Sequence, residues 1–286
     1  MTDPSLFNTV LVWPILNALV GIYKILFLLN TPYALGFSII GLTVVIRFIL
    51  YPLTASQLRA SRKMQEVSPH LSKLKEKHKN DAKMLQQETM KLYKEHGVNP
   101  AAGCLPVLVQ IPIIWGLYSV LSQIVALGPQ SVVSSINKVV YFDFLKLTST
   151  WDPSFFGLPL GQNPAHLIST TGPLILLVPL LTALFQFIQS KMMTLSSPPS
   201  GEKNLPTTRL PAEQGGQEKK KKDDFASAFQ SQSLYIFPLM IGFFSYQFPI
   251  GLSLYWNTFT VFGIIQQYQI SGLGGLESLW QKKKKQ

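Results

Sequence analysis

Four stretches of this chain are apolar enough to cross a membrane as helices, since one crossing takes about 20 mostly apolar residues. They are Tyr33–Leu58, Leu105–Leu127, Thr170–Met192 and Gln232–Ile270. The last stretch has 39 residues, which would form a helix of about 58 Å. We therefore expect it to make two crossings that fold at Phe248-Pro249-Ile250-Gly251. The pattern predicts an all-α polytopic membrane protein with a five-span core.

A further apolar stretch, Leu6–Leu29, carries a polar face. Asn17, Gly21 and Lys24 stand at positions i, i+4 and i+7, which places them on one side of a helix. Such a helix favours the membrane interface, so we expect an N-terminal amphipathic helix that lies on the outer surface. A sixth crossing, which would put the N-terminus inside, stays open as the alternative.

The segments between the spans differ in character. Arg59–Pro100 has apolar residues at helical spacing on both sides of Asn80-Asp81, which predicts a helical hairpin that turns there. Thr194–Ser231 is rich in proline, glycine and charge, and we expect it to be disordered. Gly128–Leu167 contains WDPSFFGLPLG and further aromatic residues, which indicates an ordered segment at the outer interface.

The predicted organisation follows from these stretches. In chain order it is an N-terminal interfacial helix (1–30), the first span (31–58), a cytoplasmic helical hairpin (59–100), the second span (101–127), an extracytoplasmic loop (128–168), the third span (169–193), a disordered basic cytoplasmic loop (194–231), the fourth and fifth spans as a hairpin (232–270) and a basic cytoplasmic tail (271–286).

The sidedness in this scheme comes from the basic residues. Of the 25 Lys and Arg residues, 21 lie in Arg59–Lys94, Lys191–Lys222 and Lys282–Lys285. The positive-inside rule places these three segments in the cytoplasm. With five spans, the N-terminal segment then lies outside, and we expect a multi-pass protein of the cell membrane.

The composition gives little support to an enzyme. The single cysteine, Cys104, excludes an intrachain disulfide and a cysteine-rich metal site, and the four histidines are not at metal-ligand spacing. The sequence has no nucleophile-elbow, zinc-protease or phosphate-binding glycine motif. We therefore expect no enzymatic activity, no cofactor and no metal.

Arg47 is the most informative residue, because it lies inside the apolar run of the first span. An ionised guanidinium at that depth costs between ~3 and ~15 kcal/mol, depending on access of water, and Arg does not escape by losing its proton. No Asp or Glu lies in any predicted span to neutralise it. The sequence therefore predicts water, a partner or a polar ligand beside Arg47.

Polar residues on the other spans suggest what surrounds Arg47. Four of the five predicted spans have a polar face: Thr43 and Thr54 with Arg47 in the first, Gln110 and Ser119 in the second, Thr182, Gln186 and Gln189 in the third, and Ser253, Trp256, Asn257, Thr260 and Gln267 in the fifth. Turned inward, these faces would line a hydrated groove that suits an anion, a carboxylate or an acidic peptide. Alternatively, the Ser and Thr groups only hydrogen-bond helix to helix.

Three motifs in this chain resemble the YidC/Oxa/Alb family of membrane protein insertases. They are NPAAGCLPVLVQIPIIWGLYSVL (Asn99–Leu121) with KLYKEHGVNP before it, FPIGLSLYWNTFTVFGIIQQY (Phe248–Tyr268), and the Arg-bearing first span that ends in YPLTASQLRASRKMQEVSPHL. The likeness covers about Tyr33–Ile270 in the expected order, and it is similar to short members without a large outer domain.

The resemblance implies site residues as well as a function. It places the groove Arg at Arg47 and further groove residues at Thr43, Gln189, Tyr255 and Trp256, with Ile111 and Ile114 as the slide for substrate helices. With Gln110, Gln186 and Asn257 from the polar faces, these are our candidate site residues. The implied function is an insertase that uses no nucleotide and passes nascent hydrophobic proteins into the bilayer through the groove.

Other functions and partners remain to be weighed. A small-solute transporter or anion pore shares the Arg and the polar faces, and a purely structural assembly factor is a third class. The basic tail suits contact with the ribosome or with the membrane surface. Nascent membrane proteins and the lipid bilayer are the expected partners, pairing with the Sec translocon is left open, and no DNA partner is expected.

Overall fold

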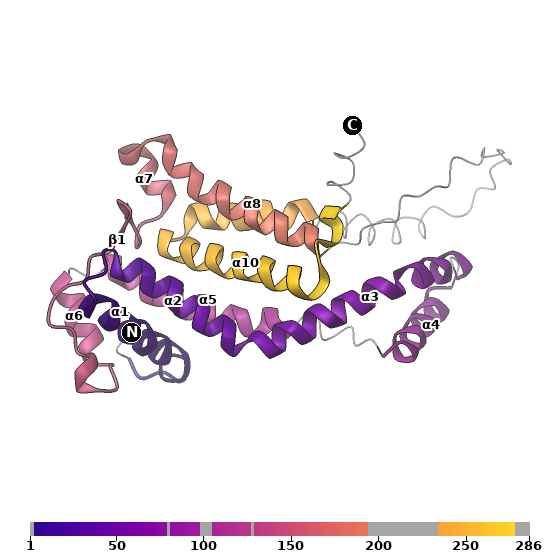
Figure 1. Cartoon of the computed structure of the whole chain (residues 1–286), viewed down its shortest axis with the longest axis horizontal. Coiled ribbons are helices and arrows are strands. Elements are labelled where there is room, and N and C mark those ends of the chain that lie inside the picture. Colours follow the sequence, from indigo (N-terminus) through magenta and orange to yellow (C-terminus); the bar gives the residue numbers. More distant parts are fainter. Residues whose placement is uncertain (1–2, 79–80, 98–104, 127–128, 194–233, 278–286) are drawn as a thin grey trace.

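The computed structural model describes residues 3–78, 81–97, 105–126, 129–193 and 234–277. Several predicted features therefore lie outside the described residues: Cys104, the loop 194–231 and the lysine runs 219–222 and 282–285. Helices α2 (Ala34–Ile49), α5 (Leu105–Ala126), α8 (Leu177–Met192) and α10 (Ile250–Ser271) lie along the long axis of the molecule, and α10 contacts the other three (Figure 1). The fold is an all-α polytopic membrane protein, apart from one very short hairpin of strands.

The first predicted span is a broken helix. The sequence predicted one helix over 31–58, whereas α2 ends at Ile49 and α3 (Tyr51–Lys77) begins after a bend of 63°. Pro52 stands in the first turn of α3, where its missing N–H leaves no helical hydrogen bond unmade. Beyond the bend, α3 passes the end of α10 and extends past the end of the bundle (Figure 1).

The fourth and fifth spans form a helical hairpin at the predicted residues. A helix over Leu234–Gln247 is followed by α10, and Pro249 is the N-cap of α10. The free N–H groups of the first turn of α10 find acceptors in the segment 129–176: Ile250 donates to the Gln162 carbonyl at 2.9 Å and Gly251 to the Leu160 carbonyl at 2.6 Å. These bonds satisfy a helix end that would otherwise be unpaired.

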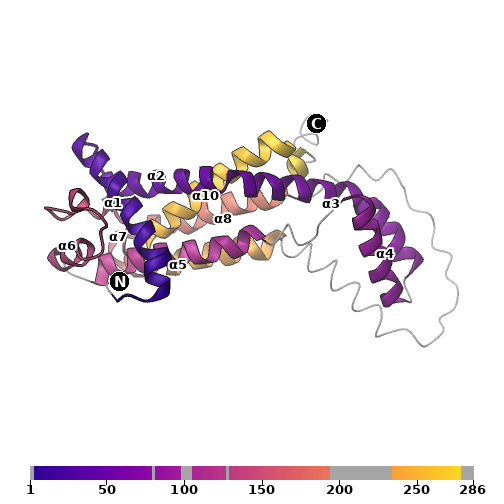
Figure 2. The same cartoon turned by 90° about the horizontal axis from the view of Figure 1, so that it is seen from below.

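Helices α3 and α4 (Ala82–Glu95) form a hairpin that projects from the end of the bundle opposite to α1 (Figures 1 and 2). The Asp81 side chain caps α4 by accepting from the backbone N–H groups of Lys83 and Met84, as the predicted turn requires. Gly97 follows with a φ of +61°, a conformation that favours glycine. Only the first part of α3 packs on the bundle, where Thr54 meets Gln266 of α10.

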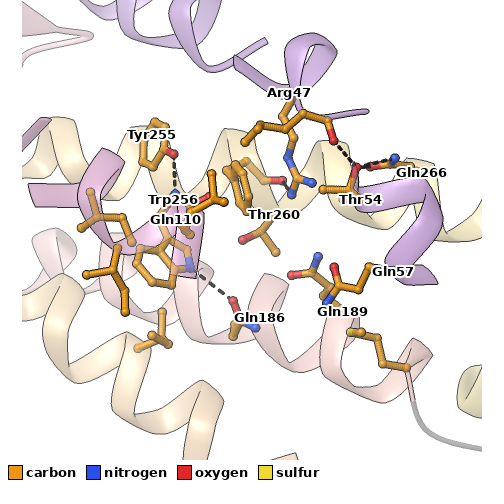
Figure 3. Close-up of a pocket in the computed structure, with 18 of the residues that line it drawn as sticks. Arg47, Thr54, Gln57, Gln110, Gln186, Gln189, Tyr255, Trp256, Thr260 and Gln266 are labelled. Atoms are coloured by element: carbon orange, nitrogen blue, oxygen red, sulfur yellow. Dashed lines mark hydrogen bonds between the residues drawn. The ribbon is translucent and has the colours of Figure 1, made fainter. Parts of the chain in front are cut away.

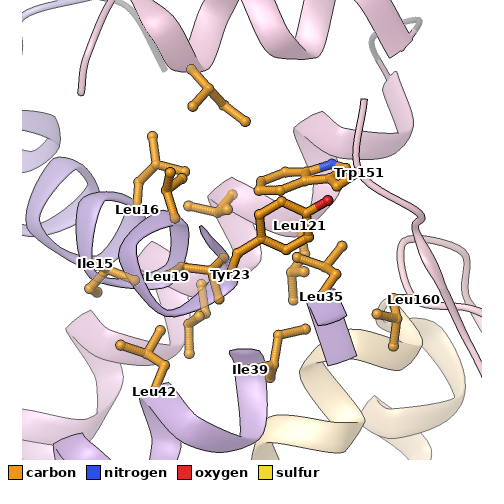
Figure 4. Packing of buried hydrophobic residues seen from close by; sticks show 14 of the residues in the cluster. Ile15, Leu16, Leu19, Tyr23, Leu35, Ile39, Leu42, Leu121, Trp151 and Leu160 are labelled. Atoms are coloured by element: carbon orange, nitrogen blue, oxygen red, sulfur yellow. The ribbon is translucent and has the colours of Figure 1, made fainter. Parts of the chain in front are cut away.

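The segment 129–176, called the outer segment because most of it belongs to the predicted extracytoplasmic loop, is ordered around a hydrophobic core. It comprises α6 (Pro129–Asn137), η3 (Asp143–Leu145), the antiparallel strands β1 (Ser154–Phe155) and β2 (Leu158–Pro159), α7 (Pro164–Thr171) and η4 (Pro173–Leu176). Trp151 is buried and meets the ring of Tyr23 edge-on at 5.6 Å. Figure 4 shows Trp151 beside Leu16, Leu19, Leu35 and Leu121, so the outer segment and the helices share one core.

The N-terminal helix crosses the end of the bundle. A π-turn, η1 (Asn8–Val12), leads into α1 (Trp13–Leu28), which runs across the other helices in Figure 2. Its polar residues Asn17 and Lys24 form hydrogen bonds with the outer segment. Asn17 donates to the Val139 carbonyl at 3.1 Å and accepts from the Tyr141 N–H at 2.7 Å, and Lys24 donates to the Phe144 carbonyl at 2.5 Å. The outer segment covers that face.

Helix lengths bear on the number of spans. Among the described residues, Asn8–Leu28 and Pro173–Met192 are long and apolar enough to cross a membrane, and the bent pair Ala34–Ile49 with Tyr51–Lys63 qualifies as one broken span. Val109–Ser122 and Leu234–Gln247 are apolar but shorter. The five-span count and the interfacial position of α1 therefore stay predictions, since length alone also allows α1 to cross.

Candidate functional site

A cavity of about 520 Å³ lies between α2, the start of α3, α5, α8, α10 and the helix Leu234–Gln247 (Figure 3). One part of its wall is polar and is formed by Arg47, Thr54, Gln57, Gln110, Gln186, Gln189, Tyr255, Trp256, Thr260 and Gln266. The remainder is apolar: Leu50, Leu53, Leu58, Val109, Ile111, Ile114, Met193, Phe237, Met240, Ile241, Phe244, Phe259 and Gly263. The cavity therefore combines polar and apolar lining residues and has one charge.

Arg47 is held by α10 and, among the described residues, by no carboxylate. Arg47 is only 3% exposed. One guanidinium nitrogen, Nη2, donates to the Phe259 carbonyl, and the guanidinium carbon lies 3.3 Å from the centre of the Phe259 ring. The Nε atom makes no hydrogen bond within the described residues, and the ion pairs found there, Arg62–Glu66 and Lys146–Asp143, do not involve Arg47.

Gly263 gives the guanidinium its room. A Cβ atom at this position would lie 2.6 Å from Nη2 of Arg47 and would overlap the side-chain amide of Gln189. Since real Cβ atoms do not approach that closely, any larger residue would push both polar groups away from α10. The absence of a side chain at Gly263 therefore lets α2, α8 and α10 bring Arg47 and Gln189 together.

Side-chain hydrogen bonds fix the other polar groups in place. Trp256 Nε1 donates to Gln186 Oε1 at 3.1 Å, Gln110 Nε2 donates to the Tyr255 hydroxyl at 2.6 Å, and Gln266 Nε2 donates to Thr54 Oγ1 at 2.8 Å (Figure 3). Each pair joins two different helices. The hydroxyl of Thr260 is buried without a partner among the described residues, so the wall keeps unused hydrogen-bonding capacity.

The structure brings most of the predicted site residues to this cavity. Arg47, Gln110, Gln186, Gln189, Tyr255, Trp256, Ile111 and Ile114 line it. Thr43 and Asn257 do not. Thr43 is buried and donates its hydroxyl to the Ile39 carbonyl at 2.6 Å, within its own helix. Asn257 lines a separate crevice on the opposite side of α10, because the residue after Trp256 is rotated by about 100° around the helix axis.

Other residues of the predicted polar faces join helices instead of lining the cavity. Thr182 of α8 lies 3.1 Å from the Ser245 hydroxyl, which in turn lies 2.8 Å from the hydroxyl of Ser253 in α10. These three hydroxyl groups are buried, and they match the alternative prediction of hydrogen bonds between helices. For these hydroxyls, packing between spans accounts for the polarity.

Four polar cavity residues were not among the candidate site residues: Thr54 and Thr260, which the sequence placed on polar faces, and Gln57 and Gln266, which it did not single out. Gln57 follows Thr54 by three residues, so the same helical spacing that marks Thr54 also marks Gln57. Gln266 stands beside Gln267, and the sequence offers no reason to prefer one over the other. In the fold, Gln266 meets Thr54 while Gln267 lies 3.5 Å from the Met192 carbonyl.

The chemistry available here is binding and positioning. Carboxamides, hydroxyls, an indole N–H and one guanidinium offer both donors and acceptors to a polar chain, while the apolar part of the wall suits a hydrophobic helix. Within the described residues, no group of three or more His, Cys, Asp or Glu side chains is placed to hold a metal ion. Ile111 is 54% exposed, so the apolar wall continues onto the outer surface of α5.

The family model and the similar proteins that match this chain belong to one family. The family model described as "60Kd inner membrane protein" matches residues 27–273. The chain is 32% identical over 253 residues to the membrane protein insertase YidC of Fusobacterium nucleatum, covering 87% of this chain and 93% of that protein. It is 30% identical over 274 residues to the insertase MisCA of Bacillus subtilis, covering 94% and 81%.

Relatives differ in length. The chain is 32% identical over 253 residues to a YidC insertase of Streptomyces avermitilis, and the match covers 87% of this chain but only 54% of that protein. The chain thus spans about half the length of this relative and most of the length of the Fusobacterium and Bacillus relatives.

Proposed function

The chain belongs to the YidC/Oxa/Alb family of membrane protein insertases, and we propose that it inserts hydrophobic proteins into the bilayer through the cavity around Arg47. The observation that carries this proposal is the mixed lining: one guanidinium without a carboxylate partner among the described residues and several carboxamides, together with aliphatic and aromatic side chains. A membrane protein entering the bilayer needs both kinds of surface, since its polar tail and its apolar helix travel together.

The polar part of the wall receives the substrate's polar tail. Peptide groups in hydrocarbon cost several kcal/mol each when unsatisfied. Arg47, Gln186, Gln189 and the Thr260 hydroxyl offer hydrogen bonds in place of that cost, and the positive charge favours an acidic tail. Because Arg47 has no carboxylate partner among the described residues, the substrate competes with no internal anion for it.

The apolar part of the wall guides the substrate helix. Ile111 and Ile114 of α5 line the cavity together with Phe237, Met240 and Phe244 of the helix Leu234–Gln247. A substrate helix moves along these side chains into lipid, and the favourable transfer of its apolar residues drives the step. No residue of the chain needs to form or break a covalent bond, and no nucleotide is needed.

The α3–α4 hairpin is the receiving element in this proposal. Its basic residues place it in the cytoplasm, together with the lysine runs 219–222 and 282–285. The N-terminal segment lies outside, and α1 rests at the outer interface. The basic tail then faces ribosomes that carry nascent chains, and an encounter with the Sec translocon is compatible with the same orientation.

A small-solute transporter or anion pore is the competing function. A protein with this function would use Arg47 in the same cavity, but the function gives no role to the aromatic and aliphatic residues that line it. The relatives named above are insertases, so this alternative is not favoured.

Reconstitution tests the proposal directly. The purified full chain is placed in vesicles, and a small membrane protein with an acidic outer tail is added without nucleotide. We expect the substrate to become protected from protease only in vesicles that hold the chain, and an Arg47→Ala chain to protect much less. Equal protection by empty vesicles, or uptake of small anions without insertion, would contradict the proposal.

A further inference from the structure

The short turn that follows α10 packs on the end of α8. Helix α10 ends at Ser271, and the 3-10 turn η5 (Gly274–Leu276) begins three residues later. In Figure 1 this turn is drawn in yellow beside the end of α8 that lies away from α7, and η5 contacts α8. Gly275, in the middle of the turn, is buried. The chain therefore continues past α10 as an ordered element with a contact to a second helix.

Gly274 makes the close approach between η5 and α8. Its φ is +52°, and a Cβ atom on it would lie 2.0 Å from the carbonyl oxygen of Met192 and 3.0 Å from the carbonyl carbon. The neighbouring atoms belong to the backbone, which does not rotate away as the end of a long side chain can. Since only glycine has no Cβ atom and adopts this φ at no cost, the contact requires glycine at this position.

The position of Met192 is coupled to that of Gln189, one helical turn earlier. Met193 donates its N–H to the Gln189 carbonyl at 3.1 Å, which ties the last residues of α8 to the turn that carries Gln189. Gln267 of α10 also reaches the Met192 carbonyl, but its Nε2 lies at 3.5 Å, which is long for a hydrogen bond. The backbone contact with Gly274 is closer, so we assign the position of this helix end to η5.

Gln189 brings the position of this helix end into the cavity. Its Nε2 atom and Nη2 of Arg47 both lie within 2.6 Å of the point where a Cβ atom on Gly263 would stand. The amide and the guanidinium are therefore neighbours, and both residues line the cavity. A shift of the end of α8 would change the distance between these two groups.

We infer that Gly274 is a positioning residue, because the contact of η5 with the Met192 backbone holds Gln189 beside Arg47. The residues of η5 are Gly, Gly and Leu, so the turn offers no polar side chain to a substrate and acts through α8. The inference rests on the proposed function, in which Gln189 and Arg47 receive the polar tail of the substrate.

The charge felt at position 189 tests the inference without any substrate. The full chain with Cys104→Ser and Gln189→Cys, in phosphatidylcholine vesicles, is treated with two methanethiosulfonates, one with a sulfonate and one with a trimethylammonium group. The guanidinium of Arg47 attracts the anionic reagent and repels the cationic one. We expect the ratio of the two rates to be about tenfold higher than in the same chain with Arg47→Ala, the effect of one nearby charge in a partly hydrated cavity. An equal ratio with Arg47→Ala would overturn the inference.

Gly274→Asn then displaces the end of α8. Asn adopts a positive φ more readily than other side chains, so the main change is the new Cβ atom against Met192, and we expect the ratio to fall to about threefold or less. Gly272→Asn is the matched control, because its φ is +73° but its Cβ atom would meet Glu277 at an ordinary 3.8 Å, and it should keep the full ratio. Equal ratios in the two variants would overturn the inference.

A second variant serves where Gly274→Asn fails to fold, as its melting in detergent shows. Replacing residues 273–276 with four Ser keeps the chain at full length and removes η5. The ratio should fall in this variant too, and an unchanged ratio would overturn the inference. Because the reagents report only on position 189 and Arg47, a chain that gives these results but inserts no substrate would contradict the proposed function and leave the positioning role of Gly274 in place.

Discussion

The guanidinium of Arg47 lies 3.3 Å from the centre of the Phe259 ring, and its Nη2 atom donates to the carbonyl of the same residue. A single residue of α10 thus holds the charge from two directions, through its ring and through its main chain. Such a ring contact stabilises a cation without neutralising it. The positive charge stays available to a ligand in the cavity.

Two substitutions at Arg47 test whether its positive charge or its planar shape is needed for insertion. We expect Arg47→Ala to lower the rate of insertion by about tenfold or more, a loss of about 1.4 kcal/mol, because the charge is gone. Arg47→Lys should retain most of the rate, since an ammonium also binds an acidic tail and an aromatic ring. Protease protection of substrate in vesicles measures both. Equal losses would instead indicate a ligand that needs the planar fork of Arg.

Gly263→Ala tests the close approach beside Arg47. The new methyl group would lie 2.6 Å from Nη2 of Arg47, so the guanidinium must move away from Phe259, and we expect insertion to fall toward the level of Arg47→Ala. Gly21→Ala is the control, because its methyl group would meet Leu145 at an ordinary 3.8 Å. A fully active Gly263→Ala chain would show that the position of Arg47 is not critical.

Asn17 should be a stability residue. Its carboxamide joins α1 to the outer segment through the Val139 carbonyl and the Tyr141 N–H, and Asn17→Ala leaves both groups unpaired at a cost of about 1–3 kcal/mol. We expect a lower melting temperature in detergent, with earlier protease cleavage of the outer segment. Ser134→Ala, at an exposed position of α6, should melt like the parent chain. An unchanged Asn17→Ala would mean that α1 docks through apolar contacts alone.

The α3–α4 hairpin should matter for function and little for folding. Thr54 and Arg62 of α3 reach α10, so the deletion begins after them and replaces residues 66–97 with a short flexible linker. We expect the bundle to keep its melting temperature while insertion is lost, because the receiving surface is gone. Normal insertion by the shortened chain would make the hairpin a passive surface feature.

Many residues of this site could be predicted from the sequence, and the others could not, for physical reasons. Arg47, Gln186 and Trp256 are visible because polar groups inside apolar runs need an explanation. Asn257 stands in the same run, but a broad polar face does not say which side of α10 turns inward. The contact of Asn17 with Val139 and Tyr141 joins residues more than 120 positions apart, and no local pattern reveals it.

The path of a substrate past Arg47 is the central claim, and site-specific crosslinking to a stalled nascent membrane protein tests it most directly. A photoreactive residue is placed at Ile114 or Trp256, which line the cavity, and at Leu180, an exposed residue of α8 outside it. We predict strong adducts from Ile114 and Trp256 and few from Leu180. Equal adducts from all three positions, or none from the two cavity positions, would contradict the account.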